Sequence, residues 1–522
     1  MSKETLEIFL TMCCYMSLVI GIGLYFAKRA NENSENYFIG GRSLGPWVAA
    51  MSAEASDMSG WLLMGLPGVA YWCGLSDAAW TAIGLLVGTY INWLIVAKRL
   101  HGYSIVAGNS ITIPDFFSNR YKEKKKIIMT IAAVFILIFF TVYAASCFVT
   151  VGKLFSTLFG FSYQSMMIAG AIFVVVYTFL GGFLAESASD FMQGIVMIFA
   201  LTIILVTSIV FAGGPSVVME NIKEIPGFFN FFGIAQPQVV DGVQQVSASG
   251  APLFGEAGNY GFLTIISTLS WGLGYFGVPQ VLLRFMAIRK NSELSKSRRI
   301  ATVWCAISLF AAVLIGIVGR VIYPTDLLTK STAESIFITM STNLLPPVLA
   351  GLVMAGILAA TISSSDSYLL IAASAFSKNI YQGIFKKNAT DRQVMRISRI
   401  ILLVIALIGV LLALDETSVI FSIVSFAWAG FGATFGPIML FSLFWKRTNT
   451  PGAIAGLLSG GIMVFVWNLL IKPMGGVFGI YELLPAFLIS SIVIVVVSLL
   501  TKEPSEELLR EFEMAKAYQD ED

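Results

Sequence analysis

Apolar runs of about twenty residues recur along nearly the whole chain, and they limit its possible folds more than any other feature. A helix needs about 20 apolar residues to cross the hydrocarbon core of a bilayer. The 522 residues are 57% hydrophobic and 12% charged, about half the charged fraction of a soluble globular chain. The runs do not alternate apolar and polar residues as the strands of a membrane barrel do. The sequence therefore predicts an all-α polytopic membrane protein.

We expect about thirteen transmembrane helices from these runs. They are expected at approximately 7–27, 46–73, 79–97, 127–156, 164–180, 191–213, 261–280, 300–323, 345–375, 397–414, 418–444, 452–471 and 483–500. Lysine and arginine gather in the loops after odd-numbered spans, for example at Lys98, Arg99 and Lys124–Lys126, except in the short loop 181–190, which has neither residue. Because cytoplasmic loops are enriched in these residues, the N-terminus is expected outside the cell and the C-terminus inside.

Two carboxylates, Glu54 and Asp57, lie inside the second apolar run, Pro46–Cys73. This run is longer than one crossing requires, and serine and glycine interrupt its middle. Such a segment indicates a broken helix, which is tolerated where its free carbonyl and N–H groups line a cavity and serve as ligands. The serines and glycines could instead allow tight helix packing, whereas two carboxylates in mid-span favour a functional role.

The ninth expected span contains three successive serines, Ser363, Ser364 and Ser365, followed by Asp366. Hydroxyl and carbonyl oxygens are hard ligands of the kind that suit an alkali cation. Each serine could instead donate to a carbonyl one turn earlier in its own helix. Asp366 would also fit a solvated position in the cytoplasmic half of the span.

A second candidate break lies in the seventh expected span, where three glycines and Pro279 follow Trp271 within nine residues. Trp271 and Tyr275 are one helical turn apart, so they could form a wall of a solute pocket or belong to an interfacial aromatic belt. The second and seventh spans each begin a set of five. Because five is odd, the second set runs in the opposite direction, which is typical of an inverted-repeat transporter.

The expected organisation follows from these spans. It comprises an N-terminal span and loop at 1–45, a first repeat at 46–213, an outside loop at 214–260, a second repeat at 261–444, two further spans at 445–501 and a cytoplasmic tail at 502–522.

The same stretches carry a family resemblance. The motifs are YFIGGRSLGP at 37–46, SAEASDMSGWLLMGLPG at 52–68, YTFLGG at 177–182, WGLGYFG at 271–277 with RFMA at 284–287, and FAWAGFG at 426–432. From about residue 37 to the thirteenth span, the chain resembles the sodium/solute symporter family, and within it the bacterial sodium/proline symporters. The resemblance implies a LeuT-like core of ten helices in a 5+5 inverted repeat, preceded by one helix and followed by two.

The resemblance also implies a sodium-coupled importer of L-proline that works by alternating access in the cell membrane, with no nucleic acid and no obligate protein partner. The co-transported sodium ion would be held by the carbonyls of Ala55, Met58 and Ala360 and the hydroxyls of Ser363 and Ser364. Asp57, and Asp190 at the cytoplasmic mouth, would serve coupling. The substrate-binding residues would be Ser59, Gly60, Trp61, Tyr143, Trp271, Tyr275 and Pro279.

Several positions depart from the usual proline pattern. Glu54 replaces a small residue, Val278 and Gln280 stand where glutamine and histidine are common, and residues 361–366 read TISSSD. The sodium site tolerates the last change because a serine oxygen replaces a threonine oxygen, so the departures concern the solute. One hypothesis is that Glu54 adds a proton-linked contact or a contact to the amine of the substrate.

Other functions remain as alternatives. The chain could carry another small amino acid or organic solute with sodium. A channel is disfavoured because no filter-like motif is present, and a sensor because the tail after Lys502 is short. An enzyme is least favoured, since no nucleophile with a base, no cofactor motif and no metal spacing accompanies the carboxylates; His101 is the single histidine.

Overall fold

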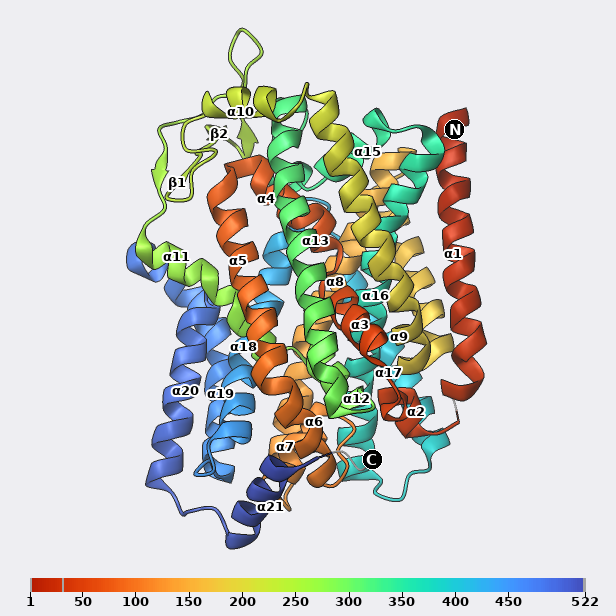
Figure 1. Ribbon diagram of the computed structural model, residues 1–522, viewed down its shortest axis with the longest axis vertical. Coiled ribbons are helices and arrows are strands. Elements are labelled where there is room, and N and C mark those ends of the chain that lie inside the picture. The colour runs from red at the N-terminus through yellow and green to blue at the C-terminus, as the bar shows by residue number, and fades with distance from the viewer. Residues whose placement is uncertain (1, 31, 520–522) are drawn as a thin grey trace.

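The computed structural model describes residues 2–30 and 32–519, which form an elongated bundle of helices (Figure 1). The long helices are α1 (Lys3–Ala30), α5 (Leu75–Ile91), α8 (Ile127–Phe159), α9 (Tyr163–Phe211), α13 (Leu294–Ile322), α16 (Pro347–Ser374), α17 (Asp391–Leu412), α18 (Ile420–Phe444), α19 (Thr450–Val466) and α20 (Leu483–Leu500). The shorter ones are α2 (Ser34–Ile39), α3 (Pro46–Asp57), α4 (Leu66–Cys73), α6 (Ala97–Val106), α7 (Ile113–Arg120), α10 (Pro215–Lys223), α11 (Phe262–Leu269), α12 (Pro279–Ala287), α14 (Lys330–Ala333), α15 (Ile336–Leu344) and α21 (Glu506–Ala517).

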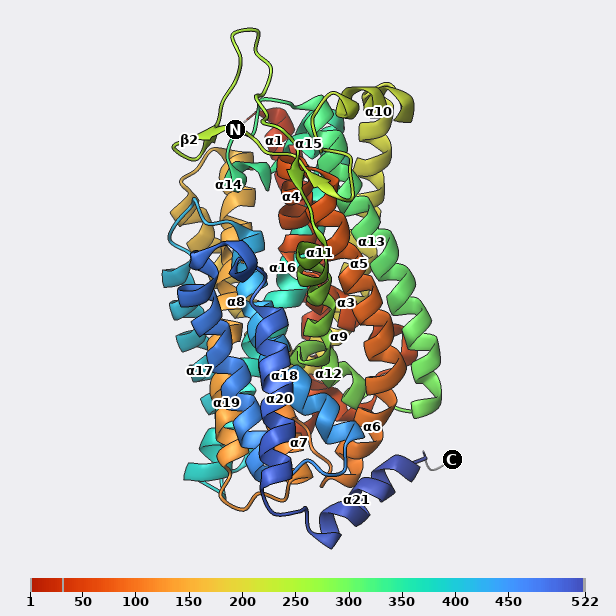
Figure 2. The same cartoon turned by 90° about the vertical axis from the view of Figure 1, so that its left-hand side faces the viewer.

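In the described part of the chain, ten helices are long and apolar enough to cross a membrane, and the bent pair Phe262–Phe276 and Pro279–Ala287 adds an eleventh. Two shorter apolar helices, Trp61–Cys73 and Tyr163–Phe179, fall where two further spans are expected. The total of thirteen crossings remains a prediction. The start of α1 and the helix α21 lie at opposite ends of the bundle (Figures 1 and 2), as an odd number of crossings requires.

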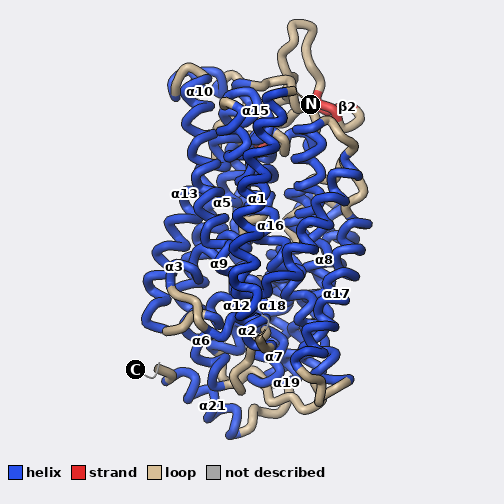
Figure 3. Tube along the Cα trace, turned by 90° about the vertical axis from the view of Figure 1, so that its right-hand side faces the viewer, coloured by secondary structure: helices blue, strands red, loops and turns tan. Residues whose placement is uncertain are grey.

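The middle of the bundle is almost entirely helical, and the loops gather at its two ends (Figure 3). The segment expected as an outside loop, 214–260, lies at the end that carries the N-terminus (Figure 1). It contains α10 and two antiparallel strand pairs, in which β1 (Gly233–Ile234) pairs with β4 (Gly258–Asn259) and β2 (Val239–Val240) pairs with β3 (Val243–Gln244).

Both predicted helix breaks are confirmed. The helix α3 ends at Asp57, and the backbone of Met58 leaves the helical region with φ −80° and ψ 77°. Helical structure then resumes in the short segment η2 (Trp61–Gly65), which leads into α4. The second break follows the tight turn η4 (Ser270–Phe276), and the helices on its two sides are bent by 41°. The regular helical backbone is therefore interrupted at both breaks.

A third change of chain direction, between the fifth and sixth expected spans, differs from the prediction. The expected spans 164–180 and 191–213 were separated by a loop, whereas helical structure continues through Phe211 with a single kink at Gly182. Gly182 has φ 59° and ψ −178°, a conformation that L-residues with a side chain avoid. One glycine therefore replaces the expected loop.

Candidate functional site

The hydroxyls of α16 meet the end of α3. Ser363 Oγ donates to the carbonyl of Ala55 at 2.7 Å and lies 3.2 Å from the carbonyl of Ala360, and Ser364 Oγ lies 3.3 Å from the same Ala55 carbonyl. Ser365 behaves differently, because its hydroxyl donates to Thr361 in its own helix at 2.6 Å. Back-bonding within the helix thus describes Ser365, while Ser363 and Ser364 reach across to the broken helix.

Four of the five predicted sodium ligands are therefore brought together, namely Ala55, Ala360, Ser363 and Ser364. The fifth, Met58, lies one turn after Ala55 where α3 ends, and its N–H donates to Glu54 at 2.8 Å. All five residues are fully buried. Carbonyl and hydroxyl oxygens crowded at a broken helix form a donor set that fits a dehydrated sodium ion.

Asp57 connects the two breaks. Its Oδ2 accepts from the hydroxyl of Tyr275 at 2.8 Å, and its Oδ1 accepts from Nε2 of Gln280 at 3.3 Å. Its backbone carbonyl lies 3.4 Å from the hydroxyl of Tyr143. The carboxylate at the end of α3 is therefore held by η4 and α12. Gln280 was noted in the sequence only as a departure from the family pattern, and its contact with Asp57 was not foreseen.

Aromatic side chains enclose the space beside the break. The ring centroids of Trp61 and Trp271 are 6.1 Å apart, and Trp428 lies 6.2 Å from Trp271 and 5.1 Å from Tyr275. Nε1 of Trp428 also donates to the carbonyl of Trp271 at 2.8 Å. Since Trp271 and Tyr275 are 4% and 1% exposed, their interpretation as interfacial belt residues is wrong. Trp428 belongs to the motif at 426–432, but no role had been assigned to it.

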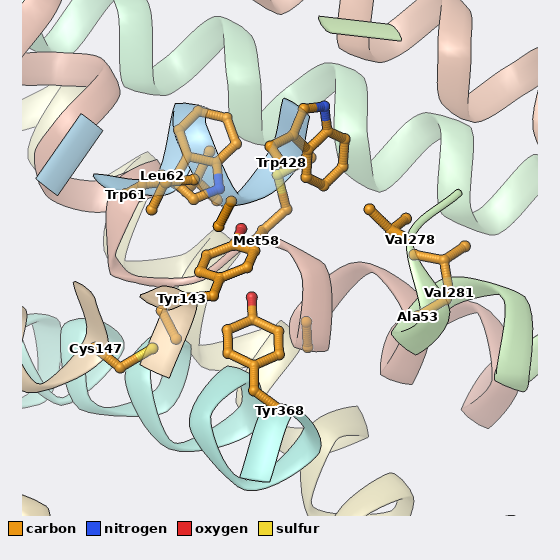
Figure 4. Close-up of a cluster of buried hydrophobic side chains, with 14 of the residues drawn as sticks. Ala53, Met58, Trp61, Leu62, Tyr143, Cys147, Val278, Val281, Tyr368 and Trp428 are labelled. Atoms are coloured by element: carbon orange, nitrogen blue, oxygen red, sulfur yellow. The ribbon is translucent and has the colours of Figure 1, made fainter. Parts of the chain in front are cut away.

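Below this group, Tyr143 packs against a further ring. The centroids of Tyr143 and Tyr368 are 4.2 Å apart, and Figure 4 shows the two rings near Met58 and Trp61. Tyr368 follows the serine run in α16 by one turn and was missed in the sequence, because a tyrosine in an apolar span carries no distinctive signal. The two rings form the floor of the aromatic enclosure.

The remaining predicted substrate residues, Ser59, Gly60 and Pro279, lie in the backbone at the two helix breaks. Ser59 and Gly60 lie between α3 and η2, and the N–H of Ser59 donates to the carbonyl of Asp57 at 3.0 Å. Pro279 is the first residue of α12, a position where its fixed φ favours a helix start and its missing N–H costs nothing. Their contribution is to fix the two helix ends that border the site.

Two adjoining cavities lie between loop residues 239–242 and the aromatic enclosure. Their volumes are about 870 Å³ and 230 Å³, and Trp72, Lys330 and Val419 line both. The smaller cavity is bordered by Phe421, whose ring centroid is 5.2 Å from that of Trp271. The smaller cavity thus adjoins the aromatic enclosure at Phe421.

Comparison with known proteins places this geometry in a family. Residues 37–460 match the sodium:solute symporter family. The chain belongs to this family. It is 40% identical over 504 residues to proteins named sodium/proline symporter from Staphylococcus aureus strains USA300 and JH9, and each alignment covers 95% of this chain and 93% of the relative. This symporter is accordingly a sodium-coupled transporter rather than an enzyme, and it spans the cell membrane several times.

The fold is shared with solved transporters. A Na⁺-coupled sialic acid symporter in a substrate-bound outward-open state has a TM-score of 0.76 at 18% identity, covering 96% of this symporter and 99% of that chain. Mhp1, a nucleobase-cation-symport-1 family transporter, has a TM-score of 0.53 at 13% identity, covering 93% and 100%. At these identities the likeness concerns the fold alone.

A buried charge network joins α3, α9, α12 and α16. Arg284 in α12 pairs with Glu186 and with Asp190 Oδ2, the latter at 3.2 Å, and Ser52 and Ser367 bond the same groups. Asp190 was predicted at the cytoplasmic mouth, and here its side chain is fully buried. No sequence signal had singled out Arg284 or Glu186 as partners.

Two further carboxylates are also enclosed. Asp366 is 2% exposed and accepts from the N–H of Ser367 at 2.8 Å, so its interpretation as a solvated residue is wrong. Glu54 is 1% exposed, and its Oε1 accepts from the indole N–H of Trp93 at 3.4 Å. Among the residues that the structure describes, no group of three or more His, Cys, Asp or Glu side chains is arranged to hold a metal.

Proposed function

We propose that this symporter imports L-proline together with sodium by alternating access, using a 5+5 inverted-repeat core. The observation that carries the proposal is the contact of the Ser363 hydroxyl with the Ala55 carbonyl. Ala55 lies two residues before Asp57, whose carboxylate contacts the second broken helix at Tyr275. The solute assignment is supported by 40% identity to proteins named sodium/proline symporter.

In the proposed cycle, sodium enters from outside and is bound by Ala55, Met58, Ala360, Ser363 and Ser364. The ion then fixes the end of α3, which positions Asp57 and the aromatic enclosure. The carboxylate of a zwitterion would be stabilised at the start of a half-helix, where free N–H groups and the helix dipole favour an anion. The apolar ring of proline would pack against Trp61, Trp271 and Tyr275.

The energetic drive is sufficient for accumulation. One charge that crosses 100 mV releases about 2.3 kcal/mol, and a tenfold sodium gradient adds about 1.4 kcal/mol. The sum of about 3.7 kcal/mol supports accumulation by several hundredfold at one sodium ion per solute. The outer cavities and the enclosed network at Arg284 support an outward-facing start, from which the loaded site would open inward by rocking of one helix set against the other.

The test is uptake of radiolabelled L-proline into proteoliposomes with sodium or choline outside, in the wild type, Ser363→Ala, Ser365→Ala and Asp57→Cys. Ser365→Ala is the matched control, since its hydroxyl bonds only within α16. We expect sodium-dependent accumulation that is lost in Asp57→Cys, needs much more sodium in Ser363→Ala and is retained in Ser365→Ala.

A second candidate is sodium-coupled import of another small amino acid. It is favoured by Gln280, which stands at a position that departs from the proline pattern and contacts Asp57. Sodium-dependent binding of another solute without proline uptake would establish this candidate, whereas the absence of any sodium dependence would refute both.

A further inference from the structure

The two helices that follow the expected repeats reach the candidate site. α19 and α20 lie side by side at one edge of the bundle (Figures 1 and 2), and α20 packs against α18 and η4. The segment that joins them ends with Tyr481 and Glu482, directly before α20 begins. The ring of Tyr481 stacks on the ring of Trp271, with the centroids 5.1 Å apart and the planes inclined by 25°. A residue from outside both expected repeats therefore contacts the aromatic enclosure.

Hydrogen bonds to two other helices fix Tyr481. Its backbone N–H donates to Oγ of Ser267 in α11 at 2.7 Å. Its hydroxyl donates to the carbonyl of Ser425 in α18 at 2.6 Å. Because α11 leads directly into η4 and α18 packs against η4, both bonds tie Tyr481 to the elements around Trp271.

The next residue, Glu482, anchors the same segment by charge. Glu482 is fully buried, accepts from Nδ2 of Asn468 at 3.0 Å and pairs with Lys472 at 2.8 Å. Nζ of Lys472 also lies 6.0 Å from the ring centroid of Tyr481. A buried carboxylate that is paired and hydrogen-bonded is favourable only in that arrangement, so the segment before α20 holds a fixed position.

Ring contacts orient the indole of Trp271. Its ring centroid lies 5.2 Å from that of Phe421, 6.1 Å from that of Trp61 and 6.2 Å from that of Trp428, with interplanar angles of 46°, 31° and 31°. The contact with Tyr481 is thus the shortest and the most nearly parallel of the four. Aromatic pairs contribute free energy beyond the area that they bury, so Tyr481 is well placed to hold this indole.

We propose that Tyr481 is a positioning residue, which holds Trp271 against the ring of the solute and thereby helps to set solute affinity and the size of the solute ring that is accepted. This inference rests on the proposed function, in which Trp271 belongs to the solute pocket. Removal of the Tyr481 ring would leave space beside Trp271 into which the indole could move. Proline would then bind more weakly, and a cyclic imino acid with one more methylene would be rejected less strongly.

The first experiment measures initial sodium-dependent uptake of radiolabelled L-proline and of pipecolate, its homologue with one more ring methylene, into proteoliposomes. An aromatic pair is equivalent to about twofold to tenfold in affinity. Tyr481→Ala should therefore raise the KM for proline by about this factor with a smaller change in kcat, and should raise the ratio of kcat/KM for pipecolate to kcat/KM for proline. Tyr481→Phe keeps the ring and should stay near the wild type in both respects.

The second experiment needs no solute. The symporter is labelled with fluorotryptophan, and the fluorine resonance of Trp271 is identified by its loss in Trp271→Phe. We expect this resonance to have the same position in the wild type and Tyr481→Phe, and to shift or broaden in Tyr481→Ala, because the ring current and the packing of the stacked neighbour are lost. An unchanged resonance in Tyr481→Ala would overturn the proposal whatever the solute is.

The matched control is Tyr381→Ala, which truncates another partly buried tyrosine, in η6 (Ala375–Phe385) at the end of α16. Thermal unfolding measures the stability that each variant loses, and Tyr381→Ala should leave the KM for proline unchanged. A shifted resonance with an unchanged KM in Tyr481→Ala, or an equal rise of KM in Tyr381→Ala, would overturn the role of Tyr481 in solute binding. Absence of proline uptake by the wild type would refute the solute assignment instead, and the fluorine resonance would still decide whether Tyr481 positions Trp271.

Discussion

One tight steric constraint near the proposed solute pocket is at Gly60, between the two halves of the broken helix. A Cβ atom added to Gly60 would lie 2.4 Å from Cγ2 and 2.7 Å from Oγ1 of Thr150 in α8. The backbone of Gly60 has φ −52° and ψ −18°, which alanine adopts without strain. The effect of Gly60→Ala should therefore be purely steric, and it should act by separating α8 from the break.

Overpacking of a buried site by one methyl group costs about 1–3 kcal/mol. If this cost falls on the solute-bound site, Gly60→Ala should lower sodium-dependent uptake at limiting solute concentration by about fivefold to 150-fold. Thr150→Ala removes the two closest atoms and leaves only its Cβ at 3.0 Å. The double variant Gly60→Ala/Thr150→Ala should then recover most of the lost uptake, while Thr150→Ala alone should stay near the wild type.

The assay is initial uptake into proteoliposomes at equal reconstituted protein, with thermal unfolding of each purified variant as a control for folding. Uptake by Gly60→Ala within twofold of the wild type would show that α8 yields freely at this point. A double variant that is folded yet no more active than Gly60→Ala would also refute the steric account, because the clash would not be the cause of the loss.

Three further predictions concern charged groups. Arg284→Gln leaves Glu186 and Asp190 buried without a cation and should lower the free energy of unfolding by about 3–5 kcal/mol, which is measured as a lower melting temperature in fluorescence-detected gel filtration. Adding Glu186→Gln should restore part of the lost stability. A double variant no more stable than Arg284→Gln would contradict the charge argument. Glu54→Gln should lower uptake or flatten the pH dependence of uptake. Unchanged uptake with an unchanged pH profile would refute a proton-linked or substrate-binding role of Glu54. Lys122 forms ion pairs with Glu507 and Glu511 of α21 at 2.9 Å and 2.8 Å, and its hydrogen bond lowers the pKa of Glu507. The ion pair with Glu507 therefore stabilises the docking of α21 at pH values above the ordinary glutamate pKa. This stabilisation is lost as the pH falls below about 4. Hydrogen exchange in residues 506–517 should rise at low pH, and already at neutral pH in Lys122→Ala; equal protection in the two proteins would refute this role.

The sequence was most informative where polar, charged or helix-breaking residues interrupt the apolar runs. Glycines, serines and carboxylates inside apolar runs predicted the breaks after Asp57 and near Gly277, and the structure contains both. The physical reason is local, since a run that is both too long and too polar for one helix can be recognised without knowing its neighbours. The apolar character of the long spans is equally local, which explains why the helical class was predicted well.

The partners of the buried charges could not be predicted in the same way. Arg284 lies 98 positions from Glu186 and 83 from Ser367 in the chain. These residues meet only because α9, α12 and α16 pack together, and the sequence does not state which faces will meet. The same holds for Trp428, which closes the aromatic enclosure from 157 positions beyond Trp271. Residue type identified these groups as unusual, whereas their contacts depend on the whole bundle.

The geometry of α3 explains why a sodium ion would alter a solute pocket that it does not touch. Ala55 and Asp57 lie two residues apart in the last turn of one helix, so the carbonyl that faces Ser363 and the carboxylate that faces Tyr275 cannot move independently. In the proposed mechanism, a sodium ion that moved this turn would therefore displace Asp57 relative to η4 and α12, which contribute Tyr275 and Gln280 to its contacts. Because interactions between two sites are reciprocal in free energy, a solute that holds the wall in place must in turn strengthen sodium binding. In the proposed mechanism, one rigid helical turn before the first break thus suffices to couple the two sites.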